Sequence, residues 1–252
     1  VNLVKKRHEG LQKMRHRLGD AAIDYQELGS FELIDETELP CLQHIDRLNT
    51  MLYDLLGGEA FTLVNHKLTK FGFAPERIKA VVSNNYEGQL DTGKMMRALL
   101  IYTQQLGITI INGAEVLNFD EQPHEVRVRV KHHYLDTDIF FTAKKLGICT
   151  NAFSKKLLPQ IDLSPGRGQV LVTHPIEKLP FKGIFHFDKG YYYFRNFKNR
   201  VIFGGGRNLD KSTETSTKFI HNTTILNDLK HKLRTFILPN TPFSIDLQLS
   251  LI

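Results

Sequence analysis

The sequence is poor in cysteine, with two among its 252 residues. Cys41 and Cys149 lie far apart and show no C-x-x-C spacing. The sequence also lacks a signal-peptide pattern of basic start, apolar core and small-residue exit. Because secreted domains of this size usually carry such features, these absences predict a protein of the reducing cytoplasm.

Long apolar runs are also missing, and the longest are short clusters such as Ala98–Tyr102. A transmembrane helix needs roughly 18 to 20 apolar residues, so we expect no membrane span. With 41% hydrophobic and 24% charged residues, the chain has the composition of an ordinary soluble globular protein, long enough for two domains. The net charge of +6 comes from basic residues interleaved with Asp and Glu, which does not favour nucleic-acid binding.

Complete phosphate-loop, dinucleotide and metal motifs are absent as well. GQLDTGKM (Gly88–Met95) matches G-x-x-x-x-G-K, but Met95 stands where a phosphate loop needs Ser or Thr for magnesium. A capped helix start is the better interpretation. Gly204–Gly206 begins like a dinucleotide fingerprint, but Leu209 occupies the place of its last glycine. The eleven histidines include no pair spaced i, i+4, so we predict no metal site.

The stretch YYYFRNFKNRVIFGGGR, residues 191–207, has the most chemical character. If its first half is a strand, Tyr193 and Arg195 share one face while Tyr192 and Phe194 share the other. A lone arginine beside phenols can hold a carboxylate through two parallel hydrogen bonds and a third from tyrosine. An arginine that lies over aromatic surface at a sheet edge explains the same residues equally well.

The pattern of apolar residues divides the chain into three segments, residues 1–87, 88–163 and 164–252. The first is mainly helical, with a short strand at Ser30–Ile34 and a helical stripe over Phe61–Phe71. The chain begins without Met inside this helical pattern and stops inside the alternating run SIDLQLSLI. We therefore expect that something has been removed on each side.

The second segment changes to helix and strand. Asp91 or Thr92 predicts an N-cap for a helix to about Leu106, and strands follow at Ile108–Ile111 and Val116–Phe119. The alternation in EVRVRV predicts a half-buried strand, and DIFFTAKKLGICTN predicts one strand followed by a buried one.

The third segment opens with a Pro/Gly loop that leads into a strand. Further strands are expected near Gly183–Phe187, Tyr191–Arg195 and Val201–Gly204. A closing helix is expected from about Thr217 to Ile237, with its apolar residues on one face.

Four stretches resemble, in order and spacing, the FAD-dependent oxidoreductases of the D-amino-acid oxidase/glycine oxidase family. They are GQLDTGKMMRALLIYTQQLGITIINGAEVLNF, KKLGICTNAFSKKLLP, LSPGRGQVLVTHP and YYYFRNFKNRVIFGGGR. The family has a helix and strand ending in valine, a strand ending in a small-residue turn, a Pro-x-x-Gly-Gln return, and a tyrosine/arginine strand followed by glycines. The ordered set, covering about Gly88 to Arg207, carries the resemblance, and no single stretch does.

The resemblance implies a fold of the α/β and α+β classes. A partial FAD-binding domain segment, residues 88–163, would accompany a substrate domain with a mixed/antiparallel sheet and flanking helices. The cofactor implied is FAD, with Val116 at its adenine end and the turn Thr150, Asn151 and Ala152 near the flavin.

The resemblance also implies that Arg195 holds the substrate carboxylate, with Tyr193 as a helper. Gly166 and Gly168 would mark the crossing back into the substrate domain, and residues 191–207 would form a hairpin on the pocket floor. The family's N-terminal β-α-β with G-x-G-x-x-G and its C-terminal glycine-rich flavin segment are not found in the sequence, and Asn151 replaces a glycine. Whether this chain alone binds FAD therefore stays open.

The implied activity is oxidation of a small-molecule amine or amino acid by hydride transfer to flavin, giving an imine that water hydrolyses. Because the cofactor carries this chemistry, no catalytic acid/base pair is required, and none is visible in the sequence. The alternative is a non-catalytic fragment or binding module that pairs with missing segments, which exposed apolar surface around Ile108–Phe119 would favour. The particular amine, the electron acceptor and the oligomeric state are not indicated.

Overall fold

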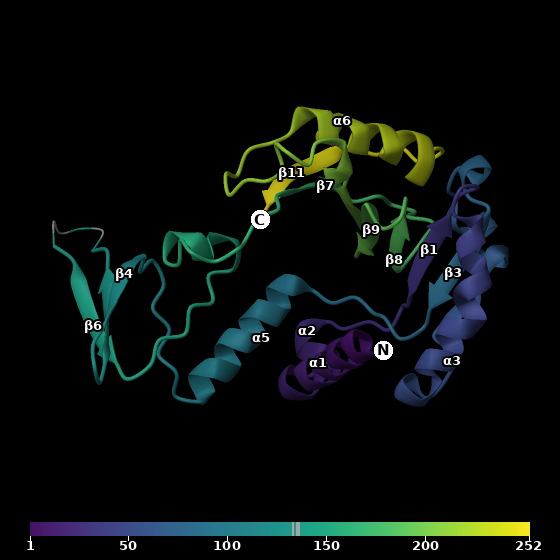
Figure 1. Ribbon diagram of the computed structural model, residues 1–252. Helices are drawn as coiled ribbons and strands as arrows, with labels where there is room; N and C mark the ends of the chain where they lie inside the picture. Colours follow the sequence, from purple (N-terminus) through teal and green to yellow (C-terminus); the bar gives the residue numbers. More distant parts are fainter. Residues whose placement is uncertain (133, 135–136) are drawn as a thin grey trace.

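The computed structural model describes residues 1–132, 134 and 137–252 of the chain. The molecule has an eight-stranded sheet with helices around it toward one end and a smaller three-stranded sheet at the other end (Figure 1). The helices are α1 (Asn2–Leu18), α2 (Asp20–Ile23), α3 (Ile45–Leu56), α4 (Leu68–Phe71), α5 (Thr92–Gln105) and α6 (Thr223–Lys232). Among the described residues, no helix has the length and apolar character needed to cross a membrane.

The strands of the large sheet come from both ends of the sequence. Their order is β11-β7-β10-β9-β8-β1-β3-β2, and every neighbouring pair is antiparallel except β1 and β8. The sheet is thus mixed, as predicted. Its strands are β1 (Ser30–Ile34), β2 (Phe61–Leu63), β3 (Ala80–Asn84), β7 (Gly168–Thr173), β8 (Ile184–Phe187), β9 (Tyr192–Phe197), β10 (Arg200–Gly205) and β11 (Ile245–Leu251).

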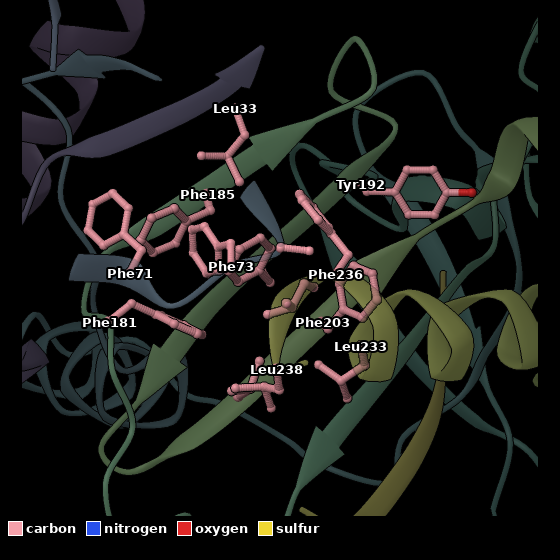
Figure 2. Packing of buried hydrophobic residues seen from close by; sticks show 14 of the residues in the cluster. Leu33, Phe71, Phe73, Phe181, Phe185, Tyr192, Phe203, Leu233, Phe236 and Leu238 are labelled. Atoms are coloured by element: carbon pink, nitrogen blue, oxygen red, sulfur yellow. The ribbon is translucent and has the colours of Figure 1, made fainter. Parts of the chain in front are cut away.

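One face of this sheet carries an aromatic core, shown in Figure 2. The Phe185 ring stacks on Phe194 at 4.8 Å between centroids and meets Phe71 edge-on at 5.0 Å. Helix α6 and the π-helical turn Leu233–Ile237 close this side with fully buried leucine and isoleucine side chains. Burying each such side chain contributes roughly 1.5 to 3 kcal/mol, so this core holds the sheet in place.

Among the described residues, the opposite face carries a second apolar cluster at one end only. There Ile34, Ala80 and Val82 pack against Leu42, which precedes α3, and against Ile45, the first residue of α3. Over β8, β9, β10, β7 and β11 the sheet has no such cluster among the described residues, and Tyr193, Leu247 and Leu251 are exposed. We call this part of the surface the open face.

The middle of the chain comprises helix α5 and a second, smaller sheet. Helix α5 begins at Asp91, whose side chain accepts a hydrogen bond from the Lys94 backbone N at 3.0 Å, and ends before Gly107 at φ 79°. The three-stranded antiparallel sheet β4-β5-β6 follows, comprising β4 (Val116–Glu121), β5 (Val126–Val130) and β6 (Ile139–Ala143). Figure 1 shows this small sheet apart from the eight-stranded sheet.

Two strands expected in this middle segment do not form. Residues Ile108–Ile111 are irregular, and so are residues 144–150, where a buried strand was predicted. Apart from the half-buried Ile110 and Ile148, both segments are exposed. A strand needs a neighbour to satisfy its backbone groups, and neither segment has one among the described residues. The apolar pattern alone could not supply that information.

Two helices also differ from their predicted extents. The stripe over Phe61–Phe71 is only partly helical, because Phe61 belongs to β2, which pairs with β3, and α4 is short. The closing helix begins at Thr223 rather than Thr217. Asn222 sets its start by accepting a hydrogen bond from the Ile225 backbone N at 3.3 Å, as an N-cap does.

Candidate functional site

Residues 192–205 form an antiparallel hairpin in the middle of the eight-stranded sheet. Strand β9 pairs with β10 from Tyr192↔Gly205 to Phe197↔Arg200, which confirms the predicted hairpin. The expected alternation is present: Tyr192 and Phe194 are buried in the aromatic core, while Tyr193 and Arg195 lie on the open face. A short period-two pattern thus separates the packing side chains from the polar ones.

Arg195 is half-buried on the open face and has no carboxylate partner among the described residues. Its Nη1 donates a hydrogen bond to the Leu90 carbonyl oxygen at 2.8 Å. Burial lowers the pKa of Arg195, and the charge of Asp91 opposes that effect. A partly desolvated guanidinium without a counter-ion has free donors and an unfavourable self-energy, so it attracts an anion.

A hollow of about 370 Å³ adjoins this guanidinium. We call it the Arg195 hollow, and its lining includes Gln89, Leu90, Asp91, Lys182, Arg195 and Lys198. The alternative prediction placed this arginine at a sheet edge, but β9 lies between β8 and β10 and is not an edge strand. Its aromatic part remains, since the Arg195 Cζ lies 5.9 Å from the Phe197 ring centroid.

Tyr193 shares the open face with Arg195 but points elsewhere. Its phenol lies over Gly204 on β10, where an added Cβ would come within 2.7 Å of the hydroxyl oxygen. A side chain at position 204 would therefore clash with the Tyr193 ring, which is a physical reason for glycine at the first of the three positions 204–206. Tyr193 does not line the Arg195 hollow. The two predicted substrate ligands thus lie side by side on one strand without touching a common hollow, and the helper role of Tyr193 stays a prediction.

The predicted cofactor residues lie outside the eight-stranded sheet. Val116 is the first residue of β4, the edge strand of the small sheet, and is 37% exposed. Thr150 donates a hydrogen bond from Oγ1 to the Ser154 Oγ at 3.1 Å, next to Asn151 and Ala152 in a short 3-10 helix. Their role in binding a cofactor stays a prediction.

The backbone of this turn fits the close approach of a cofactor. Asn151 has φ 46°, in the left-handed region where glycine is favoured and asparagine is among the best-tolerated alternatives. The chain therefore keeps a glycine-like turn where the family pattern has a glycine. The residue is also exposed.

Sequence reasoning missed two ion pairs because their members lie far apart in the chain. On the open face, the His186 Nδ1 lies 3.1 Å from the Glu32 Oε1, and strands β1 and β8 place the two residues side by side. The Glu32 carboxylate raises the pKa of His186, while burial opposes the rise. His186 is also the cross-strand partner of Tyr193. Only the parallel pairing of β1 with β8, which no local motif indicates, brings them together.

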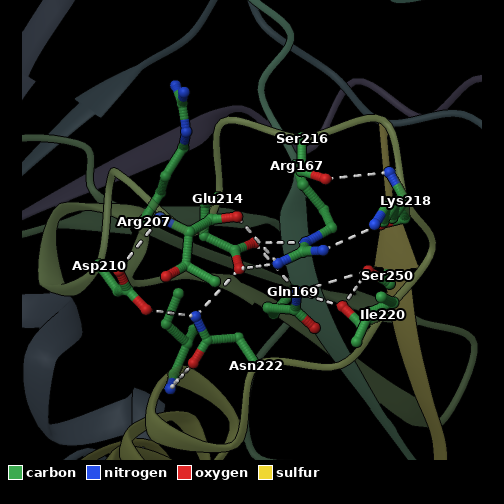
Figure 3. Close-up of polar contacts among 12 residues, drawn as sticks. Arg167, Gln169, Arg207, Asp210, Glu214, Ser216, Lys218, Ile220, Asn222 and Ser250 are labelled. Atoms are coloured by element: carbon green, nitrogen blue, oxygen red, sulfur yellow. Dashed lines mark hydrogen bonds and ion pairs between the residues drawn. The ribbon is translucent and has the colours of Figure 1, made fainter.

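The second missed pair joins Arg167, just before β7, to Glu214 in the chain that follows β10 (Figure 3). The Arg167 Nη2 and Nε donate to the two Glu214 carboxylate oxygens at 2.7 and 3.1 Å, and Gln169 and Asn222 donate to the same carboxylate. Burial disfavours the charge, yet these donors keep the pKa of Glu214 below its usual value. We call these four residues the buried clasp. It fixes residues 207–222 against β7.

The chain matches the family model described as FAD dependent oxidoreductase (DAO) over residues 2–246. Among curated proteins, none matches.

Solved structures of similar fold include two glycine oxidases and a proline dehydrogenase. The glycine oxidase from Geobacillus kaustophilus has a TM-score of 0.75 at 17% identity, covering 98% of this chain and 64% of that one. For the glycine oxidase from Bacillus cereus the values are 0.73, 15%, 98% and 67%. For L-proline dehydrogenase from P. horikoshii they are 0.72, 18%, 98% and 65%. The chain thus spans less than two thirds of the length of the first and third of these proteins.

The TM-scores show a shared fold, and at these low identities the likeness shows the fold alone. The family model covers nearly the whole chain. The chain belongs to the DAO family of FAD-dependent oxidoreductases.

Proposed function

We propose that the protein oxidises an amino acid or amine, and that Arg195 holds the substrate carboxylate on the open face. The observation that carries this proposal is the half-buried Arg195 guanidinium, which forms no ion pair and donates one hydrogen bond, to a backbone carbonyl, among the described residues. A substrate carboxylate would supply the counter-ion through two parallel charge-assisted hydrogen bonds. Proteins of similar structure include a glycine oxidase and an iminodiacetate oxidase, which supports a substrate of this class.

The chain's own task in this reaction is orientation. Arg195 would fix the carboxylate end, so that the carbon bearing nitrogen takes one position above the sheet. When bound, FAD supplies the hydride acceptor, and the resulting imine is hydrolysed by water. Val116 and the turn Thr150–Ala152 would hold the cofactor, which the glycine-like backbone of Asn151 supports.

The division of the chain follows from the same proposal. Residues 1–87 and 164–252 would build the substrate domain, and residues 88–163 would belong to the FAD-binding domain. In support, residues 1–87 and 164–252 together form the eight-stranded sheet, whereas the strands of residues 88–163 form the small sheet.

A second candidate is a non-catalytic fragment that pairs with other segments. It is favoured by apolar side chains left uncovered after α5, since Leu106, Ile108 and Ile111 are 62%, 51% and 57% exposed. Such a surface predicts self-association. Sedimentation velocity separates the candidates. Self-association of this chain that disappears in a version extended at both ends, with no flavin bound to either, would favour the non-catalytic fragment.

Substitution of Arg195 tests the proposed role. In the flavin-containing protein, Arg195→Ala should raise the KM for an amino acid by roughly 10- to 100-fold, the range of a lost charge-assisted pair. The KM for the matching amine without a carboxylate should stay nearly unchanged. Arg47→Ala, at an exposed arginine on α3, is the control for loss of one positive charge. Equal effects of Arg195→Ala on both substrates would refute the assignment.

A further inference from the structure

A second hollow, of about 540 Å³, lies at the end of the open face where β7 begins and β10 ends. We call it the Arg207 hollow, and its lining includes Gly166, Gly168, Tyr191, Tyr193, Arg207 and Lys211. It shares no lining residue with the Arg195 hollow, so the two can hold separate ligands. Its volume falls within the range of roughly 300 to 1,000 Å³ that small-molecule sites have, which is more than a bare ion fills.

The glycines at the end of β10 direct Arg207 into this hollow. An added Cβ at Gly205 would clash with the Tyr191 carbonyl oxygen, and Gly206 has φ 76°, in the left-handed region that favours glycine. The Gly206 backbone N donates a hydrogen bond to the same oxygen at 3.1 Å. The chain therefore turns directly after β10. The Arg207 guanidinium then lies over Gly166, where an added Cβ would come within 3.1 Å of Cζ and Nη1.

The protein itself satisfies little of the Arg207 guanidinium. Among the described residues its one hydrogen bond is a long one, from Nη2 to the Thr215 Oγ1 at 3.5 Å. Its Nε is shielded from solvent and has no acceptor within the same residues. The donors on Nη1 and Nη2 are therefore left for a ligand, and a guanidinium offers two of them in parallel to an oxyanion.

The acids nearest in sequence to Arg207 have other partners. Glu214 belongs to the buried clasp, and Asp210 accepts a hydrogen bond from the Asn222 side chain at 2.9 Å. In Figure 3 the Arg207 side chain points away from these acids. None of the described residues that line the hollow carries a carboxylate, and neither Arg207 nor Lys211 has an ion-pair partner within that part of the chain. Two unpaired cations in one hollow favour a ligand with two negative charges.

Tyr193 adds a neutral donor beside the cations. Burial raises the pKa of its phenol, so the hydroxyl is protonated at neutral pH and can donate. An added Cβ at Gly168 would lie 4.0 Å from this hydroxyl oxygen, whereas the guanidinium lies over Gly166. Because Arg167 between them points into the buried clasp, both glycines face the hollow. Their bare backbone lets the guanidinium and the hydroxyl approach one ligand.

We propose that the Arg207 hollow binds the phosphate group of a small organic molecule. A phosphate group carries about −1.5 to −2 charges at pH 7 and three acceptor oxygens, which matches two cations and a phenol. The remaining volume, beside Tyr191 and Tyr193, would receive the organic part. Free inorganic phosphate offers the same chemistry, and the test separates these two sources. The inference goes beyond the proposed function, because it requires neither a substrate at Arg195 nor a bound flavin.

Calorimetric titration with glycerol 3-phosphate, inorganic phosphate and glycerol, in a phosphate-free buffer, tests the proposal. Glycerol 3-phosphate should bind several-fold more tightly than inorganic phosphate, and glycerol should not bind. Arg207→Gln should weaken glycerol 3-phosphate binding roughly 10- to 100-fold, the range of a lost charge-assisted pair. Lys211→Gln, at an exposed residue outside the core, should weaken it in the same direction. Arg195→Gln and Arg47→Gln, which each remove one positive charge elsewhere, should leave it unchanged.

Each result decides the question. Equal affinities for glycerol 3-phosphate and inorganic phosphate, both dependent on Arg207, would assign the site to the free ion and overturn the organic ligand. Absence of binding, or binding that Arg207→Gln leaves unchanged in a protein with unchanged thermal unfolding, would overturn the site altogether. Binding that Arg195→Gln abolishes would place the phosphate in the Arg195 hollow and overturn the proposal.

A last comparison separates the proposed ligand from the cofactor. Glycerol 3-phosphate should bind equally well to this chain and to a flavin-loaded version extended at both ends. Binding that flavin abolishes would assign the hollow to the cofactor and overturn the proposal. Flavin reduction by an amino acid is measured separately, so the failure of this inference and the failure of the proposed function are distinguishable.

Discussion

Breaking the buried clasp should destabilise the fold by about 3 to 5 kcal/mol. The Arg167 and Glu214 side chains are 3% and 0% exposed, so neither charge has water to replace its partner. Arg167→Met removes both bonds to Glu214 and also the bonds from Nη1 and Nη2 to the carbonyl oxygens of Lys218 and Thr213, at 2.9 and 3.1 Å. The Glu214 carboxylate then remains buried with only Gln169 and Asn222 as donors.

Urea unfolding at neutral pH measures this loss directly. The pKa of Glu214 is lower in the folded protein than in the unfolded chain. The stability that this carboxylate contributes is therefore complete at a pH above its unfolded pKa, and it is lost only as the pH falls through its folded pKa. The double variant Arg167→Met/Glu214→Leu should recover about 1 kcal/mol or more, since it leaves no unpaired charge. Lys5→Met breaks the exposed pair with Glu9 and should cost less than about 0.5 kcal/mol. An Arg167→Met loss as small as that of Lys5→Met would refute the reasoning.

Two further predictions concern the core and the open face. Phe185→Ala should cost about 3 to 5 kcal/mol in urea unfolding, because this fully buried ring contacts five other phenylalanines, whereas Phe141→Ala at a 44% exposed site should cost less than about 1 kcal/mol. Glu32→Gln should reduce stability by about 0.5 kcal/mol near pH 5 and by nothing near pH 9. The raised pKa of His186 adds stability below its ordinary value that is lost as pH rises through the folded value. Similar losses at Phe185 and Phe141, or a Glu32→Gln effect larger at high pH, would contradict these accounts.

The hairpin at the centre of the open face could be predicted from sequence because its information is local. Alternation assigned Tyr193 and Arg195 to one face and Tyr192 and Phe194 to the other, and the structure has the same division. The N-cap of α5 could also be predicted, since Asp91 acts within one turn of the helix start.

The remainder depends on strand pairing, which local patterns do not encode. Ile108–Ile111 has the composition of a strand but no neighbour among the described residues, whereas Phe61 joins β2 because β3 is available. The hollow lined by Gly166, Tyr193 and Arg207 could not be predicted for the same reason. These residues come from three segments, which the antiparallel pairing of β7, β10 and β9 brings together.

The most direct test of the central proposal is a flavin absorption spectrum, recorded for this chain and for a version extended at both ends. Amino acids are then added without oxygen. The account predicts flavin bands at least in the extended protein and bleaching of those bands by an amino acid, with Arg195→Ala requiring a much higher amino acid concentration. Flavin bands that no amino acid or amine bleaches, or no flavin in either version, would contradict it.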